Sequence, residues 1–130
     1  MTKDLKHILC IDDESSILEI TTLCLETVGL YKVTACQCGN EGIRTAIEVQ
    51  PDLILIDVMM PDMDGTTALL KLKENHKTES IPVIFMTARV QPDEIDNYKN
   101  SGAIGVIAKP FDPMTLSDEI AEIWQSSRRG

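Results

Sequence analysis

The stretch from Leu53 to Gly65 reads LILIDVMMPDMDG. Its apolar beginning, Leu53–Ile56, is typical of a short strand that is buried on both faces. Asp57 ends this strand, and the proline, aspartate and glycine residues after it favour a turn. A helical spacing of apolar residues begins at Thr66, so the stretch predicts one strand–turn–helix unit.

The same alternation continues in both directions along the chain. Further strands are expected at His7–Ile11, Lys32–Ala35, Val83–Met86 and Val106–Ala108. Helices are expected at Ser15–Val28, Glu41–Val49, Thr66–Asn75, Pro92–Asn100 and Met114–Gln125. Five strand–helix units with apolar strands predict an α/β fold, in which helices cover both faces of a parallel sheet.

Two of the expected helices have distinctive patterns. The first can be capped by Ser15 or Ser16, and Gly29 follows its end. The residues expected on its buried face are Ile17, Ile20, Thr21, Cys24 and Val28. The helix at Pro92–Asn100 has the weakest apolar stripe, and we expect it to be the most mobile one.

Length and composition limit the classes of protein to consider. The chain has 130 residues, of which 21 are acidic and 12 basic, giving a net charge of −9. This length predicts one domain, 1–130, with an ordered core at about 6–125 and a tail or linker start at 126–130. No apolar run approaches the roughly 20 residues of a membrane span, so membrane insertion is not expected. The negative charge disfavours direct binding to nucleic acid.

The cysteines and histidines do not form a recognisable metal or redox motif. Cys10, Cys24, Cys36 and Cys38 lack the spacing of a zinc site or of a C-x-x-C pair. We expect free thiols, and therefore a reducing compartment such as the cytoplasm.

Polar side chains follow four of the five expected strands. Ligands of open parallel sheets bind at the carboxyl ends of the strands, which is where Asp12, Asp13, Asp57, Thr87 and Lys109 fall. Three neighbouring carboxylates repel one another, so a divalent cation and the lysine are expected to compensate their charge. Oxygen ligands favour Mg²⁺ or Mn²⁺. Each residue alone has a simpler structural explanation, but their convergence favours a site.

Other classes of site fit less well. The sequence from Asp62 to Gly65 resembles part of a calcium loop, but such a loop would begin at Met60 and end at Lys71, where it requires acids. Pro61, Asp64 and Gly65 more simply shape the turn after the strand. A phosphohydrolase with an aspartate nucleophile would usually carry a second acid two residues after Asp57, where this chain has Met59. Nucleotide-binding glycine loops and a serine nucleophile elbow are absent from the sequence.

These motifs, in this order and spacing, resemble the response-regulator receiver domain of two-component signalling. The matching segments are Asp12-Asp13, Asp57 with Met60-Pro61-x-x-Asp64-Gly65, Thr87-Ala88 and Lys109-Pro110-Phe111. The resemblance extends over nearly the whole chain. It implies a flavodoxin-like, doubly wound (βα)5 fold with strand order 2-1-3-4-5.

The resemblance also implies a chemical role for the acidic residues. Asp57 would accept a phosphoryl group from a histidine kinase or a phosphotransfer protein. Asp12 and Asp13 would hold Mg²⁺ together with Asp57 and the backbone carbonyl of Met59. The product would be an acyl phosphate, formed and lost slowly by the domain itself rather than turned over as in an ordinary enzyme.

Further positions follow from the same resemblance. Thr87, Ala88 and Lys109 would bind the phosphoryl oxygens. A cis peptide bond before Pro110 would position the lysine. Pro61, Asp64 and Gly65 would position the turn after Asp57. Met59 and Arg89 would lie at the mouth of the site and tune access to it.

Position 106 departs from the family pattern. Receivers commonly carry Tyr or Phe there, and this ring moves inward together with the threonine corresponding to Thr87; this chain has Val106. The site therefore looks intact while its usual switch does not. Phosphorylation either changes protein contacts by another route, or is uncoupled from output in a constitutive interaction module.

The downstream partner, the cognate kinase and the pathway are not indicated by the sequence. The chain is either a stand-alone receiver or the beginning of a longer regulator. The surface between the fourth and fifth helices is a candidate for output and for homodimer formation.

Overall fold

The computed structural model describes residues 4–129, and its centre is a parallel sheet of five strands in the order β2-β1-β3-β4-β5. The strands are β1 (His7–Ile11), β2 (Lys32–Cys36), β3 (Leu53–Asp57), β4 (Val83–Thr87) and β5 (Gly105–Ala108). Their positions and order confirm the doubly wound fold that the sequence and the resemblance predict.

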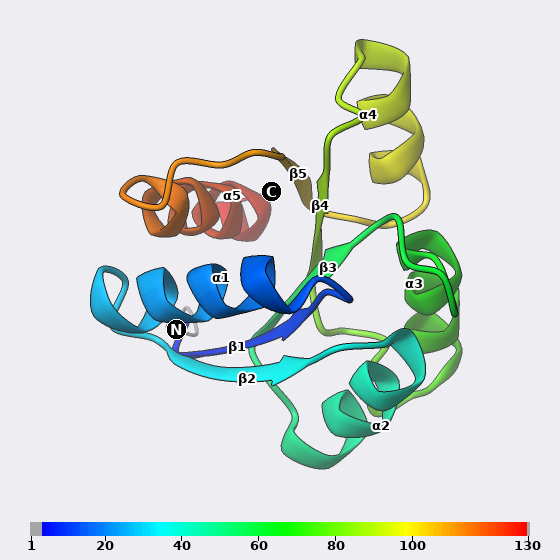
Figure 1. Cartoon of the computed structure of the whole chain (residues 1–130). Helices are drawn as coiled ribbons and strands as arrows, with labels where there is room; N and C mark the ends of the chain where they lie inside the picture. Colours follow the sequence, from blue (N-terminus) through cyan, green and yellow to red (C-terminus); the bar gives the residue numbers. More distant parts are fainter. Residues whose placement is uncertain (1–3, 130) are drawn as a thin grey trace.

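Helices cover both faces of this sheet (Figure 1). One face carries α1 (Ser15–Thr27) and α5 (Leu116–Arg129); the other carries α2 (Gly39–Val49), α3 (Gly65–Glu74) and α4 (Pro92–Asn100). The weakly patterned stretch before β5 is thus helical, with Tyr98 as its buried residue.

The two layers follow from the alternation of side chains along each strand. In β1, Leu9 and Ile11 belong to the core under α2, α3 and α4, while Ile8 and Cys10 belong to the core under α1 and α5. Every residue of β3 is buried, as expected for a central strand. This strand carries Asp57 at its end.

The predicted cap of α1 is wrong, and its predicted buried face is confirmed only at Thr21 and Cys24. The N-cap residue is Glu14, which makes no side-chain cap hydrogen bond, and the buried residues are Leu18, Thr21, Cys24 and Leu25. Ile20 and Val28 are 45% and 41% exposed. Apolar residues surround most of this helix, so its periodicity fits two faces and only packing selects one of them.

The last helix also differs from the prediction. It begins at Leu116 and continues through Arg129, so residues 126–129 are helical rather than a tail, and Gly130 lies outside the described residues. Two side-chain contacts support the final turn: the Ser127 hydroxyl donates to the Trp124 carbonyl at 2.8 Å, and the Arg128 guanidinium lies 4.8 Å from the centre of the Trp124 ring.

The four cysteines are free, as expected from their spacing. None of the helices within residues 4–129 combines the length and the hydrophobicity that a bilayer-spanning segment requires.

Candidate functional site

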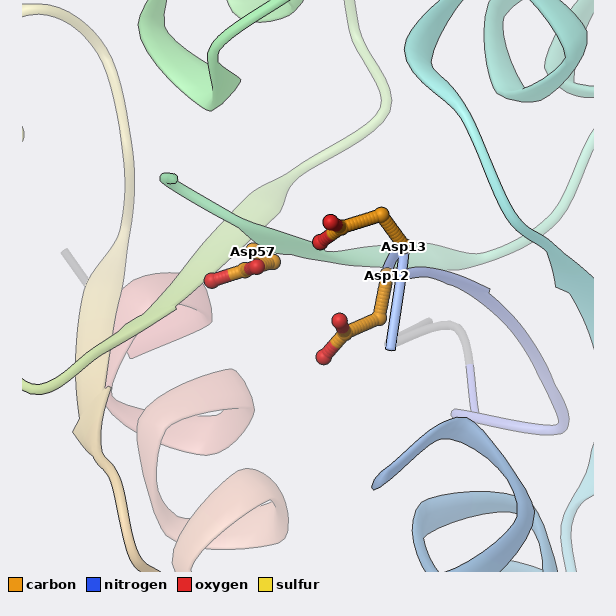
Figure 2. A group of neighbouring side chains, drawn as sticks. All are labelled: Asp12, Asp13 and Asp57. Atoms are coloured by element: carbon orange, nitrogen blue, oxygen red, sulfur yellow. The ribbon is translucent and has the colours of Figure 1, made fainter. Parts of the chain in front are cut away.

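Three carboxylates meet at the carboxyl ends of β1 and β3 (Figure 2). Asp12 and Asp13 directly follow β1, and Asp57 is the last residue of β3. One carboxylate oxygen from each residue lies within 4.8 Å of the other two. Asp12 and Asp57 are only 5% and 4% exposed. The predicted convergence of the three acids is therefore confirmed.

Lys109 supplies a positive charge to this cluster. It directly follows β5, and its Nζ lies 2.9 Å from Asp12 Oδ2 and 3.3 Å from Asp57 Oδ1. Its backbone N–H donates to the Thr87 carbonyl at 2.9 Å, and the peptide bond to Pro110 is cis. The lysine thus bridges residues from two other strand ends.

Within this cluster, the pKa of Asp57 and the pKa of Lys109 are both raised. Burial, and next the charge of Asp12, raise the pKa of Asp57 to about 6, although Lys109 and the Met59 N–H oppose this change. Burial alone would lower the pKa of Lys109, but its contacts with Asp12 and Asp57 outweigh burial and raise that pKa. The lysine therefore stays charged at neutral pH, where Asp57 is mostly ionised.

Asp13 provides the clearest indication of a cation site. Its Oδ1 is buried and has no hydrogen-bond partner, whereas Asp12 Oδ1 accepts the Glu14 N–H at 3.0 Å. A buried carboxylate oxygen without a partner is costly unless a donor or a cation satisfies it. An all-oxygen donor set of this kind fits Mg²⁺ or Mn²⁺.

The loop between β3 and α3 is closely tied to Asp57. Asp64 caps α3 by accepting the Thr67 N–H at 2.8 Å, and the Gly65 N–H donates to the Val58 carbonyl at 2.8 Å. A Cβ atom at Gly65 would lie 2.8 Å from the Asp57 carbonyl oxygen, so only glycine fits here. The predicted turn is confirmed at Asp64 and Gly65, and exposed Pro61 lies within it.

β4 pairs with β3 on the side opposite β1, so the loop after β4 also begins next to the end of β3, where Asp57 lies. Thr87 ends β4 and is 1% exposed, while Ala88 and Arg89 are exposed directly after it. The Thr87 hydroxyl oxygen accepts the Arg89 N–H at 3.1 Å. On the other side of the site, Met59 is 59% exposed. Both residues predicted at the mouth of the site are thus accessible to solvent.

Val106 is half-buried on β5, opposite Phe85 of β4. It lines a groove between α4 and α5 whose other apolar residues include Ile95 and Ile123. A small aliphatic side chain therefore occupies the position where the resemblance implies a large ring.

The residue pattern of the sequence does not indicate one contact near the site. Asp62, considered there only as part of a calcium loop, accepts the N–H of Gly39 at the start of α2. The contact joins the β3–α3 loop to the first residue of α2, which is distant in the sequence, and no local pattern indicates it.

Comparison with known proteins agrees with this geometry. Residues 8–121 match the family described as response regulator receiver domain. The chain is 39% identical over 107 residues to the DNA-binding dual master transcriptional regulator RpaA of Synechocystis sp.. The aligned region covers 82% of this chain and 44% of RpaA. It is 33% identical over 110 residues to the protein PilH of Pseudomonas aeruginosa, covering 85% of this chain and 90% of PilH.

Solved structures show the same similarity. The chemotaxis protein CheY4 of Vibrio cholerae superposes with a TM-score of 0.84 at 28% identity, over 92% of this chain and 99% of CheY4. A CheY-like receiver domain protein of Methanospirillum hungatei superposes with a TM-score of 0.79 at 32% identity, over 98% of this chain and 100% of that protein. The chain spans about half the length of RpaA and of several other matched regulators.

Proposed function

The chain belongs to the response regulator receiver domain family, and we propose that Asp57 is the residue at which it is phosphorylated. The observation that carries this proposal is the position of Lys109, whose Nζ bridges Asp12 and Asp57 at the end of the sheet. A buried carboxylate held beside a fixed cation and two further acids suits a nucleophile that receives an anionic group.

In the proposed reaction, an Asp57 carboxylate oxygen attacks the phosphorus atom of a phosphohistidine. A phosphorus–oxygen bond forms as the phosphorus–nitrogen bond of the donor breaks, and the histidine nitrogen leaves with the bonding electron pair and takes up a proton. Lys109 offsets the charge that collects on the phosphoryl oxygens. The Thr87 hydroxyl oxygen accepts the Arg89 N–H and would donate its own hydrogen to a phosphoryl oxygen. The Ala88 N–H would be a second donor.

A divalent cation would be held by Asp12, Asp13, Asp57 and the Met59 carbonyl, and Mg²⁺ or Mn²⁺ suits these ligands. When bound, it supplies positive charge that reduces repulsion between the carboxylates and the incoming phosphoryl group. The unpartnered Asp13 oxygen supports this assignment. Met59 and Arg89, exposed on either side of the site, would control how readily water reaches the acyl phosphate.

The module would act through protein contacts rather than by turnover of external substrates. A histidine kinase or phosphotransfer protein in the cytoplasm would supply the phosphoryl group, consistent with the free cysteines. Phosphorylation would then shift the population of a second conformation that a downstream protein or output domain binds. The surface between α4 and α5 is the candidate output surface, and also a candidate for a homodimer.

Mass spectrometry of the intact protein tests the phosphorylation site. The chain is incubated with a small phosphodonor and Mg²⁺, and we expect the mass of one phosphoryl group to be added. The gain should be absent from Asp57→Ala and in the presence of EDTA, and should be retained in Asp96→Ala, which removes an exposed acid from α4. An unchanged wild-type mass, with a donor that phosphorylates another receiver, would contradict the proposal.

Val106 favours one alternative, a constitutive interaction module in which phosphorylation leaves the output surface unchanged. NMR spectra with and without beryllofluoride, a mimic of the phosphoryl group, distinguish the two functions. A switch requires shifts in α4 and β5. Shifts confined to residues around Asp57 would favour the constitutive module.

A further inference from the structure

The loop after the proposed phosphorylation site makes a contact with α2 that its position in the sequence does not indicate. Asp62 Oδ2 accepts the backbone N–H of Gly39, the first residue of α2, at 3.2 Å. The N-cap residue of this helix is Cys38, and its side chain makes no cap hydrogen bond. Asp62 therefore satisfies one of the free N–H groups of the first turn from another loop, and its negative charge lies at the positive end of the helix dipole.

The neighbouring residue strengthens this contact by packing. A Cβ atom at Gly39 would lie 3.0 Å from the Met63 sulfur and 3.1 Å from Met63 Cβ, so the Met63 side chain lies directly against this glycine. Met63 is partly buried against the core under α2, α3 and α4. Two consecutive loop residues thus rest on the start of α2, one through a hydrogen bond and the other through van der Waals contact.

The same loop carries backbone groups to the site. The Met59 N–H forms a hydrogen bond with the Asp57 carboxylate. The side chain of Met59 is 59% exposed, so it contributes little to fixing its own backbone. The loop is held at its base by the Gly65–Val58 hydrogen bond, by the Val58 N–H that donates to the Met86 carbonyl and by the buried side chain of Met60, and on its side by Asp62. Loss of the Asp62 hydrogen bond would therefore remove one of the restraints on the segment that contains Met59, the one that ties it to α2.

We propose that Asp62 is a positioning residue, which sets the backbone at Met59 for the divalent cation by fastening the β3–α3 loop to the start of α2. This inference rests on the proposed function, since it deepens the account of the same metal site. Loss of an interaction that orients a ligand group from outside the ligand set typically weakens metal affinity about 10- to 100-fold, and we expect Asp62→Ala to weaken Mg²⁺ binding by about tenfold, the lower end of this range.

Three variants that each remove one negative charge separate positioning from a general charge effect. Asp62→Ala removes the acceptor, and Asp62→Asn retains an oxygen that can accept the Gly39 N–H. Glu48→Ala removes an exposed acid near the far end of α2. Two quantities are measured by NMR: hydrogen exchange of the Gly39 amide, and the Mg²⁺ dissociation constant from shifts of the Asp13 and Met59 amides.

We expect faster Gly39 exchange and weaker Mg²⁺ binding in Asp62→Ala only, with values close to wild type in the other two variants. Unchanged Mg²⁺ affinity in Asp62→Ala would overturn the proposal and leave Asp62 as a helix cap. Equal loss in Asp62→Asn would overturn it in favour of a charge effect, and unchanged Gly39 exchange would show that the contact is not formed. A wild-type chain that does not bind Mg²⁺ would overturn the metal site itself, a failure that is visible before any variant is compared.

Discussion

Lys109 Nζ lies 3.3 Å from Asp57 Oδ1, although Asp57 ends β3 and Lys109 follows β5, two strands that are not neighbours in the sheet. The same nitrogen lies 2.9 Å from Asp12 Oδ2. One ammonium group thus faces a cluster of three carboxylates, and negative charge remains in excess. This excess of negative charge raises the pKa of Asp57 and disfavours its ionised form in the folded chain.

Asp57→Asn should stabilise the metal-free chain at neutral pH. Because folding raises the pKa of Asp57 from 3.8 to about 6, ionisation disfavours the folded state. The penalty is absent below about pH 4, grows as pH rises through about 6, and then reaches about 2–3 kcal/mol. Urea unfolding in EDTA should show Asp57→Asn more stable by this amount at pH 7.5, and nearly equal to wild type at pH 4. A difference that does not vary with pH would contradict this explanation.

Mg²⁺ should raise the melting temperature of the wild-type chain, because a ligand that binds only the folded state stabilises it. At saturating concentrations the gain is about 1–3 kcal/mol. Asp13→Asn should lose most of this gain, since Asp13 Oδ1 is the buried oxygen that lacks a partner. Thermal unfolding with and without Mg²⁺ measures the effect, and Asp93→Asn on α4 is the control. A full Mg²⁺ response in Asp13→Asn would exclude this residue as a ligand.

Lys109→Met should destabilise the chain by about 2–4 kcal/mol at pH 7.5, because it leaves two buried carboxylates without their cation. The loss should be smaller at pH 5, where Asp57 takes up a proton. Urea unfolding at both pH values tests this. Lys73→Met, which removes an exposed contact with the Glu79 carbonyl, should change the unfolding free energy by about 0.5 kcal/mol or less. Equal effects of the two substitutions would show that Lys109 has no special electrostatic role.

Gly65→Ala should destabilise the chain by about 2 kcal/mol or more, since the new methyl group would overlap backbone atoms that cannot rotate away. Its Cβ would lie 2.8 Å from the Asp57 carbonyl oxygen and 3.0 Å from Val58 Cα. Phosphorylation from a small donor should also become slower, because the end of β3 must shift. Lys71→Ala, at an exposed position further along α3, is the control and should behave like wild type. A stable, fully reactive Gly65→Ala would show that this close approach is not required.

The sequence predicts the location of the site well for a topological reason. The carboxyl ends of all the parallel strands lie at one edge of the sheet, so Asp12, Asp13, Asp57 and Lys109 could be brought together without knowledge of any distance. The roles of Thr87, Ala88 and the residues at the mouth stay predictions, because they concern groups that arrive only with the phosphoryl donor.

Other features depended on packing between segments that are distant in the sequence. Leu18 is buried and Ile20 exposed on α1 because the helix docks in one of two orientations that its apolar residues allow. Contacts of Trp124 extend α5 through a segment whose polar composition favours a tail. The Asp62–Gly39 hydrogen bond joins the β3–α3 loop to the start of α2, and neither segment alone indicates it.

The hydrogen bond from the Arg89 N–H to the Thr87 hydroxyl oxygen links the end of β4, beside the proposed site, to the short segment that precedes α4. If Thr87 turns toward a phosphoryl group on Asp57, as the proposed function implies, the Arg89 N–H would either move with the hydroxyl group or lose this hydrogen bond. Either change would alter the restraint on the short segment that leads into Pro92, without the movement of an aromatic ring on β5. This route from the site to α4 would therefore not depend on an aromatic side chain at position 106, where this chain has valine.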